Sequence, residues 1–144
     1  MTEKTMQSGL ALMHGDLTRK IIGAFFDVYN EVGPGYAEAV YQRALPVLLG
    51  ERGLSAEIER PVVIQFHGVV IGEYRVDLVV GESVIVECKV ATKILPIHEV
   101  QLLNYLKATG LCVGLILNFG SEPSFRRLLL TSDRGKRVVA RAQG

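Results

Sequence analysis

Apolar side chains recur along the first third of the chain with the spacing of an amphipathic helix. Residues 17–32 carry such a stripe, at about 3.6 residues per turn, and Asp16 offers an N-cap in front of it. The Gly33-Pro34-Gly35 run is expected to end this helix. A second helix is expected over residues 36–50, with a kink or an early stop at Pro46, because proline removes a backbone donor.

The pattern changes to β-branched, strand-like positions after Ala56. The expected strands cover residues 57–66, 69–80 and 84–90. His67-Gly68 marks the turn between the first two, and a second turn falls around Gly81-Glu82. Strands joined by such short turns are expected to pair antiparallel.

A third helix is expected over residues 96–109, because Pro96 suits a first helical position and Gly110 a C-terminal stop. Residues 111–119 form an apolar run typical of a buried strand, and residues 124–130 fit a short helix or a strand. The strand after the third helix is expected to return to the sheet by a right-handed crossover.

Together these elements predict an α+β fold of the α/β sandwich kind, in the order ααβββαβ. We expect a mixed central sheet of about four to five strands flanked by helices. The chain has 144 residues, enough for a single core. We expect a flexible N-terminus over residues 1–15, one domain over residues 16–130 and a basic C-terminal tail over residues 131–144.

Composition narrows the class of protein without naming a function. Hydrophobic residues make up 49% of the chain and charged residues 22%, which fits a globular domain and not a disordered one. No apolar run approaches the ~20 residues that span a bilayer, and no signal-peptide pattern follows the N-terminus. We therefore expect a cytoplasmic protein without a membrane partner, in which Cys88 and Cys112 are free thiols.

Charge is unevenly distributed, although the net charge is only +1. Residues 126–144 hold six Lys or Arg against Asp133 alone, whereas residues 21–125 hold seven against twelve acidic residues. A basic tail could recruit nucleic acid. A solvated tail without a partner explains the same distribution, so both interpretations stand at this point.

The candidate chemistry lies in the expected hairpin of residues 73–89. If its loop is Gly81-Glu82-Ser83, Val80 pairs with Val84, and Asp77 then lies opposite Glu87. The face with the two acids also carries Val79, Ile85 and Lys89, and the other face carries Val76, Leu78, Val80, Val84, Val86 and Cys88. Both faces are largely apolar, so the two strands are expected to be covered on both sides.

Two carboxylates side by side in an apolar environment repel each other. A shared proton, a salt bridge to Lys89 or a bound divalent cation would relieve this repulsion. Oxygen ligands favour Mg²⁺ or Mn²⁺ over zinc or copper. The alternative is an ordinary surface pair of Glu87 and Lys89 on an edge strand, with Asp77 solvated.

Three motifs resemble a known family. Asp77, followed after nine residues by Glu87-Cys88-Lys89, resembles the signature of the PD-(D/E)XK nuclease superfamily. Residues 35–41 resemble the motif that names the GxxExxY proteins, a bacterial branch of that superfamily, through Gly35, Glu38 and Tyr41. Residues 97–106 also resemble that branch, and Gln101 and Tyr105 match the Q-x-x-x-Y helix motif of some superfamily exonucleases.

The resemblance implies a metal site and roles for its residues. Asp77, Glu87 and the backbone carbonyl of Cys88 would bind Mg²⁺, and Glu38 would complete the ligand set. Lys89 would orient or deprotonate the attacking water. Val76 stands where some members have a proline before the aspartate, a departure that many members share.

Further residues are expected to support the site or to touch the substrate. Gln101 and Tyr105 lie one helical turn apart and would face the acids, whereas Tyr41 fits either a site-facing or a core tyrosine. His98, Arg126 and Arg127 are candidate contacts to nucleic acid.

The sequence therefore predicts a Mg²⁺-dependent nuclease that acts on DNA, with RNA as the less favoured substrate. The alternative is a module of the same fold that binds nucleic acid or protein without turnover. A homodimer that forms a DNA-wide cleft from two subunits is compatible with either hypothesis.

Overall fold

The structure is a computed structural model that describes residues 13–133 and 136–144. Its helices are α2 (Gly15–Val32), α3 (Glu38–Glu51) and α4 (Pro96–Thr109). Its strands are β1 (Ala56–Phe66), β2 (Val69–Val80), β3 (Val84–Lys89), β4 (Val113–Asn118), β5 (Ser124–Asp133) and β6 (Lys136–Gln143). Most of the flexible N-terminus expected over residues 1–15 lies outside the described residues.

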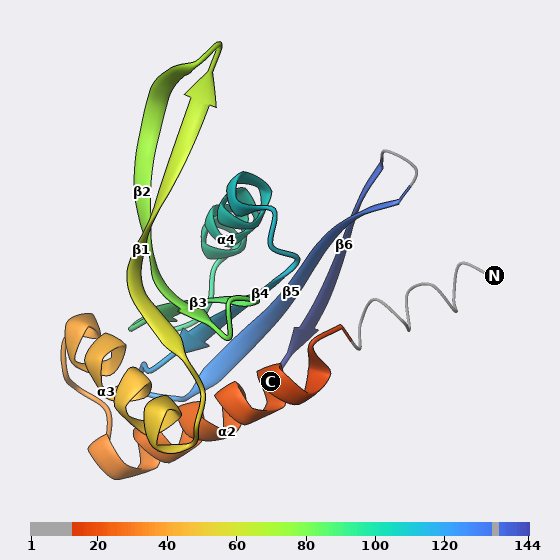
Figure 1. The fold of residues 1–144 in the computed structure, drawn as a ribbon. Coiled ribbons are helices and arrows are strands. Elements are labelled where there is room, and N and C mark those ends of the chain that lie inside the picture. The colour runs from red at the N-terminus through yellow and green to blue at the C-terminus, as the bar shows by residue number, and fades with distance from the viewer. Residues whose placement is uncertain (1–12, 134–135) are drawn as a thin grey trace.

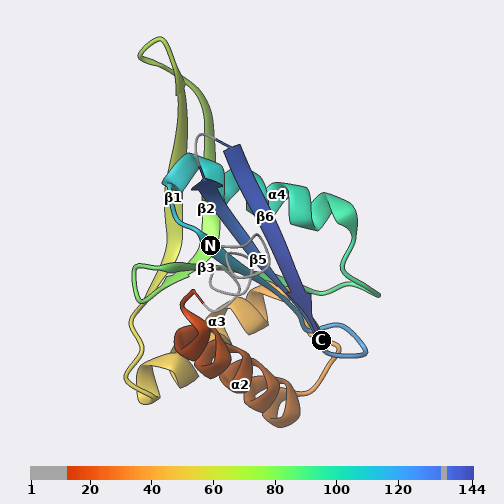
Figure 2. The same ribbon diagram turned by 90° about the vertical axis from the view of Figure 1, so that its right-hand side faces the viewer.

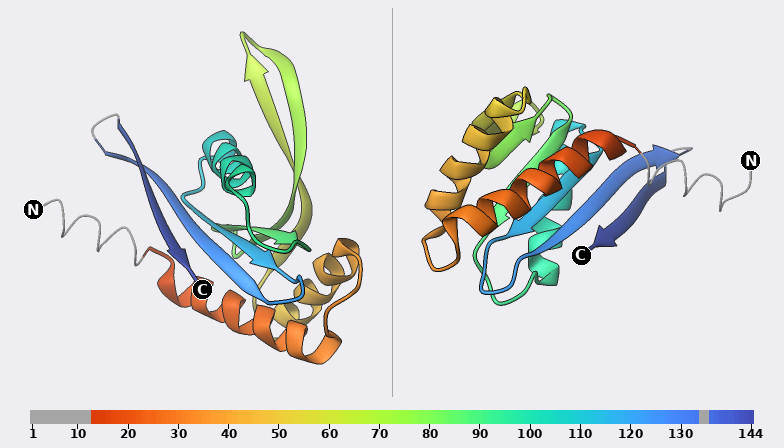
Figure 3. Two further views of the ribbon diagram at one scale, coloured as in Figure 1. Left: turned by 180° about the vertical axis from the view of Figure 1, so that it is seen from behind. Right: turned by 90° about the horizontal axis from the view of Figure 1, so that it is seen from below.

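The strands form one six-stranded sheet in the order β1-β2-β3-β4-β5-β6. All neighbours pair antiparallel except β3 and β4, which run parallel and are joined through α4. Helices α2 and α3 lie on one face of the sheet and α4 on the other (Figure 1, Figure 3). None of the helices in the described part of the chain is long and apolar enough to cross a membrane.

Each face of the sheet carries its own apolar core. On one face the inner sides of α2 and α3, including Phe25 and Leu45, pack on alternate residues of the central strands. On the other face Leu102 of α4 packs beside Ile85 and Ile116. Gly114 lets α4 approach closely, because a Cβ atom there would lie 2.7 Å from the Leu102 side chain. The two cores cover β3 and β4 on both sides, as the apolar runs predict.

The predicted fold class is confirmed, with two corrections in the helices. Asp16 does not cap α2: it lies in the first turn, and His14 occupies the N-cap position. The early stop at Pro46 is wrong, because α3 continues to Glu51. Leu45 and Leu49, on either side of the proline, are fully buried, and this packing holds the helix together despite the missing donor.

The C-terminal part of the sheet is larger than predicted. Residues 124–133 form a strand, β5, which settles the choice between helix and strand. Residues 136–143, predicted as part of a basic tail, form β6 and pair antiparallel with β5. The sheet therefore has six strands where we expected four to five. Charged side chains are common on edge strands, and they hid the strand pattern of β6.

The β1–β2 hairpin extends beyond the rest of the sheet, next to α4 (Figure 1, Figure 2). Its outer part exposes apolar side chains, among them Phe66 and Ile71, at 62% and 63%. Glu59 adopts φ 52 between the pairs Ile58–Leu78 and Arg60–Val76, which interrupts the ladder. Val76 of β2 packs in the core beside α4, contrary to the face predicted for it.

Candidate active site

Asp77 and Glu87 lie side by side where the β2–β3 ladder ends, and backbone amides donate a hydrogen bond to each of their carboxylates. The predicted register is confirmed, because Val80 pairs with Val84, and the pairing continues to Leu78 and Val86. One step further, the Asp77 amide donates to Glu87 Oε1 at 3.1 Å. The Cys88 amide donates to Asp77 Oδ2 at 2.8 Å. Side-chain carboxylates therefore replace backbone carbonyls as acceptors, which fixes the two acids side by side.

This acid pair is electrostatically costly. Glu87 is only 5% exposed, and burial followed by the Asp77 charge raises the pKa of Glu87 to about 8. Burial also raises the pKa of Glu38; the Lys89 ammonium opposes this shift and the Asp77 charge adds to it. These couplings place Glu38 within electrostatic reach of both Asp77 and Lys89. The site thus concentrates acidic groups that call for a positive partner.

A polar chain runs from β3 to α4 through Lys89. The Lys89 ammonium donates to Gln101 Oε1 at 3.2 Å, and Gln101 Nε2 donates to the Tyr105 hydroxyl at 3.0 Å. Burial, and then the charge of Glu87, raises the pKa of Tyr105. Gln101 and Tyr105 therefore face the acid pair, on the i, i+4 spacing expected from the sequence.

The start of α3 brings Glu38 and Gln42 close to Asp77. Gln42, one helical turn after Glu38, donates from Nε2 to Asp77 Oδ1 at 3.0 Å. This contact was not predicted from the sequence. The i, i+4 spacing from Glu38 is the signal that would have indicated it.

The loop before α3 explains the other two residues of the G-x-x-E-x-x-Y pattern. Gly35 adopts φ 106, which a residue with a side chain rarely does. Tyr41 is fully buried; its hydroxyl donates to the Gly33 carbonyl at 2.7 Å and accepts from the Tyr36 amide at 3.2 Å. Its ring stacks on Phe119 with centroids 4.6 Å apart. Tyr41 is thus a core residue that holds the loop and so orients the first turn of α3.

Asn118, at the end of β4, holds the segment that follows Lys89. Its Oδ1 accepts from the amides of Ala91 and Gly120 at 3.0 and 3.1 Å, and its Nδ2 donates to the Ala91 carbonyl at 3.0 Å. The side chain is fully buried. Sequence analysis missed this role, although a lone polar residue at the end of an apolar strand is a usable signal.

The three candidate nucleic-acid contacts lie in different environments. His98 accepts a hydrogen bond from the Leu95 amide through Nδ1 at 3.0 Å, and burial and then the Lys89 charge lower the pKa of His98. Arg127 is 8% exposed and bonds to the Met13 carbonyl. Burial lowers the pKa of Arg127. A role for these residues in nucleic-acid binding stays a prediction.

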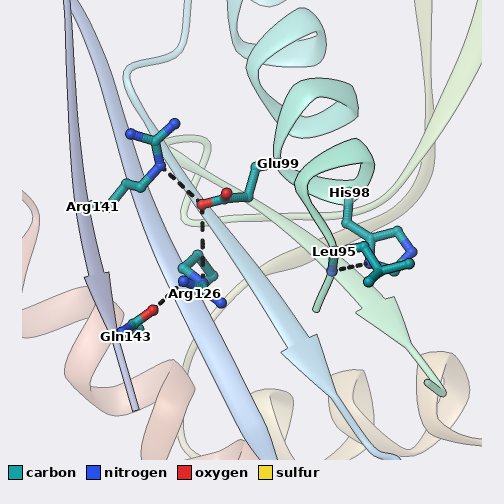
Figure 4. A network of polar contacts seen from close by, with 6 residues as sticks. All are labelled: Leu95, His98, Glu99, Arg126, Arg141 and Gln143. Carbon is teal, nitrogen blue, oxygen red and sulfur yellow. Dashed lines mark hydrogen bonds and ion pairs between the residues drawn. The ribbon is translucent and has the colours of Figure 1, made fainter. Parts of the chain in front are cut away.

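Arg126 belongs to a polar network on the side of α4 towards β5 and β6 (Figure 4). Its Nε lies 4.0 Å from Glu99 Oε1, and its guanidinium also bonds to Gln143. Arg141 Nε donates to the same Glu99 oxygen at 3.0 Å. Glu99 therefore ties α4 to the two C-terminal strands, and the Arg126 side chain is engaged within the protein.

The donor set fits a divalent cation in part. Among residues 13–133 and 136–144, no group of three or more His, Cys, Asp or Glu side chains is gathered closely enough to hold a metal ion. The close pair is Asp77 and Glu87, two oxygen donors of the kind that Mg²⁺ and Mn²⁺ prefer. Magnesium is commonly bound through one or two carboxylates, with water for the rest, so this pair is a sufficient core for a site.

A mixed sheet with a partly buried acid pair, a nearby lysine and a helix that presents Gln101 and Tyr105 to them is the arrangement of a nuclease-like α/β domain. The chain belongs to the PD-(D/E)XK nuclease superfamily, whose family model matches residues 15–128. The narrower resemblance to the GxxExxY proteins stays a prediction.

One solved structure similar to this chain is the crystal structure of SSO0001. It shares 22% sequence identity and has a TM-score of 0.45, and the match covers 72% of this chain and 48% of that chain. The chain thus spans about half the length of the solved protein it matches. No curated protein matches the chain.

Proposed function

We propose that the protein is a nuclease that depends on a divalent cation and hydrolyses phosphodiester bonds, with DNA as the favoured substrate over RNA. The observation that carries this proposal is the pair of half-buried Asp77 and buried Glu87 beside a lysine held by Gln101. Membership of the PD-(D/E)XK nuclease superfamily supports it.

In this proposal Asp77, Glu87 and the Cys88 carbonyl hold Mg²⁺ or Mn²⁺, with Glu38 as a further ligand. A divalent cation at this place supplies a Lewis acid for the phosphoryl group and lowers the pKa of water. Gln42 keeps the Asp77 carboxylate oriented, because its amide bonds to Oδ1 at 3.0 Å. The Cys88 amide donates to the other oxygen, Oδ2, at 2.8 Å, so both oxygens of the Asp77 carboxylate are held.

Lys89 supplies the positive charge next to the reacting group. Gln101 Oε1 accepts a hydrogen bond from one of the three N–H groups of the ammonium, which leaves the other two for the attacking water or a phosphoryl oxygen. Tyr105 accepts from the Gln101 amide and thereby decides which end of that amide faces Lys89. In this scheme Gln101 and Tyr105 act as positioning residues for the ammonium.

The test is cleavage of end-labelled single-stranded and duplex DNA, and of the matching RNA, by the full chain in Mg²⁺, Mn²⁺ or EDTA. We expect cleavage with either cation and none in EDTA. Lys89→Ala should lower the rate roughly 10²–10⁴-fold, and Asp77→Ala should abolish it. Lys20→Ala is the matched control, because Lys20 is exposed on α2, across the sheet from α4.

Gln101→Ala separates positioning from binding. Loss of the amide should lower kcat more than it changes KM, because Lys89 remains present but loses its acceptor. Cleavage that survives both Asp77→Ala and Lys89→Ala would refute the proposal. Binding of DNA in Ca²⁺ without cleavage in Mg²⁺ or Mn²⁺ would instead favour the non-catalytic module.

A further inference from the structure

A cavity of about 710 Å³ lies between the β1–β2 hairpin and α4. Its volume falls within the roughly 300–1,000 Å³ typical of small-ligand sites. The hairpin contributes residues of both strands, and α4 contributes residues along most of its length. The hairpin and α4, whose residues line this cavity, lie next to each other in Figure 1.

The cavity borders the candidate active site through two shared side chains. Gln101 and Tyr105 line it, and the same two side chains form the hydrogen-bonded chain to Lys89. The Lys89 charge also reaches His98, a third lining residue, whose pKa it helps to lower. A ligand in the cavity would therefore lie next to Gln101, the side chain that holds Lys89.

The walls are apolar and aromatic. Tyr74 is 49% exposed, with its ring centroid 5.9 Å from that of Tyr105. Val63 on the hairpin and Val100 on α4 expose 41% and 49% of their surface. A flat heteroaromatic ring can pack between such walls, and base stacking on an aromatic side chain is the usual means by which proteins hold unpaired bases.

The charge of the cavity fits an anionic ligand. None of its lining residues is acidic, and Lys107 contributes a positive charge at the wall formed by α4. This contrasts with the acidic excess of residues 21–125. The charge of the lining residues is therefore compatible with a ligand that carries a phosphate. Bases in a duplex are stacked on one another and present no free face, so the apolar walls select an unpaired nucleotide.

We infer that the cavity between the β1–β2 hairpin and α4 binds an unpaired nucleotide of the substrate strand, with its base on Tyr74 and its phosphate towards Lys107. This inference rests on the proposed nuclease function and specifies its substrate class as a single strand or an unpaired end. Val63 and Val100 then form the opposite walls of the base site, and Gln101 marks its border with the reacting group.

The test measures binding to the full chain in Ca²⁺ by fluorescence anisotropy. The labelled ligands are single-stranded oligodeoxythymidine, its DNA duplex with oligodeoxyadenosine, and single-stranded oligouridine. We expect the single strands to bind at least tenfold more tightly than the duplex. Tyr74→Ala should weaken single-strand binding by roughly tenfold, the loss of one stacked base, and Tyr74→Phe should retain it. The oligouridine arm reports whether the cavity distinguishes RNA from DNA.

Two exposed valines on helices provide a second test and its matched control. Val100→Glu places a negative charge in the cavity and should weaken binding, whereas Val47→Glu, on α3 at 63% exposure and outside the lining, should not. Both variants should unfold at similar temperatures, because both side chains are exposed.

Two results would overturn the inference. One is equal binding of single strand and duplex, or no binding of either. The other is single-strand binding that Tyr74→Ala and Val100→Glu leave unchanged. A change of molecular mass in light scattering with Val100→Glu, without a change in binding, would assign the cavity to contact between two copies. Divalent-dependent cleavage lost in Asp77→Ala reports on the proposed function separately, so the two failures are distinguishable.

Discussion

Replacing Glu87 with glutamine tests whether the candidate site holds unfavourable charge in the absence of metal. Glu87 is 5% exposed, and its Oε1 accepts a hydrogen bond from the Asp77 amide at 3.1 Å. Glutamine has almost the same shape and keeps an oxygen acceptor for that amide. The substitution therefore removes the ionisable group and leaves the packing in place.

The magnitude follows from the pKa of Glu87, which burial and then the Asp77 charge raise from 4.5 to about 8. Each pKa unit corresponds to about 1.4 kcal/mol, so the difference in stability is on the order of 5 kcal/mol. A raised carboxyl pKa means that the folded state binds the extra proton. The stabilising contribution is present below pH 4.5 and is lost as the pH rises through about 8.

The assay is urea unfolding of both proteins in EDTA across that pH range. Wild type should lose stability between pH 4.5 and about 8 by an amount that Glu87→Gln does not lose. The variant should therefore be the more stable protein at the alkaline end. Glu82→Gln, at an exposed turn position, is the control and should follow wild type. Superimposable pH profiles for wild type and Glu87→Gln would refute the reasoning.

The remaining predictions concern the metal, the packing of α4 and the loop before α3. Saturating Mn²⁺, at 100 times its Kd, should stabilise wild type by about 2.7 kcal/mol in differential scanning fluorimetry and leave Asp77→Ala unchanged. Gly114→Ala brings a methyl group to 2.7 Å from Leu102 and should cost about 1–3 kcal/mol in urea unfolding. Gly23→Ala, in open space on α2, is its control and should not destabilise. Tyr41→Phe should cost about 1–3 kcal/mol in the same assay, since the Gly33 carbonyl and the Tyr36 amide both lose a hydrogen bond to the hydroxyl; unchanged stability would contradict the assigned role.

Much of the fold was predictable because its signals are local. The helical spacing of residues 17–32 and the Pro96 and Gly110 boundaries each lie within a few residues of the element they define, and α4 matches its prediction. The short turn at Gly81 also set the register of β2 and β3 correctly. From that register the sequence predicted that Asp77 and Glu87 lie side by side.

Other features depend on contacts that no local pattern shows. α3 continues past Pro46 because Leu45 and Leu49 are buried against the sheet. β6 forms because β5 offers it a pairing edge. Val76 packs beside α4 and Leu78 in the opposite core, although strict alternation along β2 predicts one face for both. In each case a partner distant in sequence outweighs the local preference.

The sequence by itself determined the candidate site residues: two acids, a lysine, and a glutamine and tyrosine one helical turn apart. Short-range spacing places such residues on a common face of a strand or a helix. Only the tertiary structure decided that α3 supplies Gln42 to Asp77, that Tyr41 belongs to the core, and that α4 turns Gln101 towards Lys89. The physical reason is that these contacts join separate elements, whose relative positions are set by the packing of two apolar cores on one sheet.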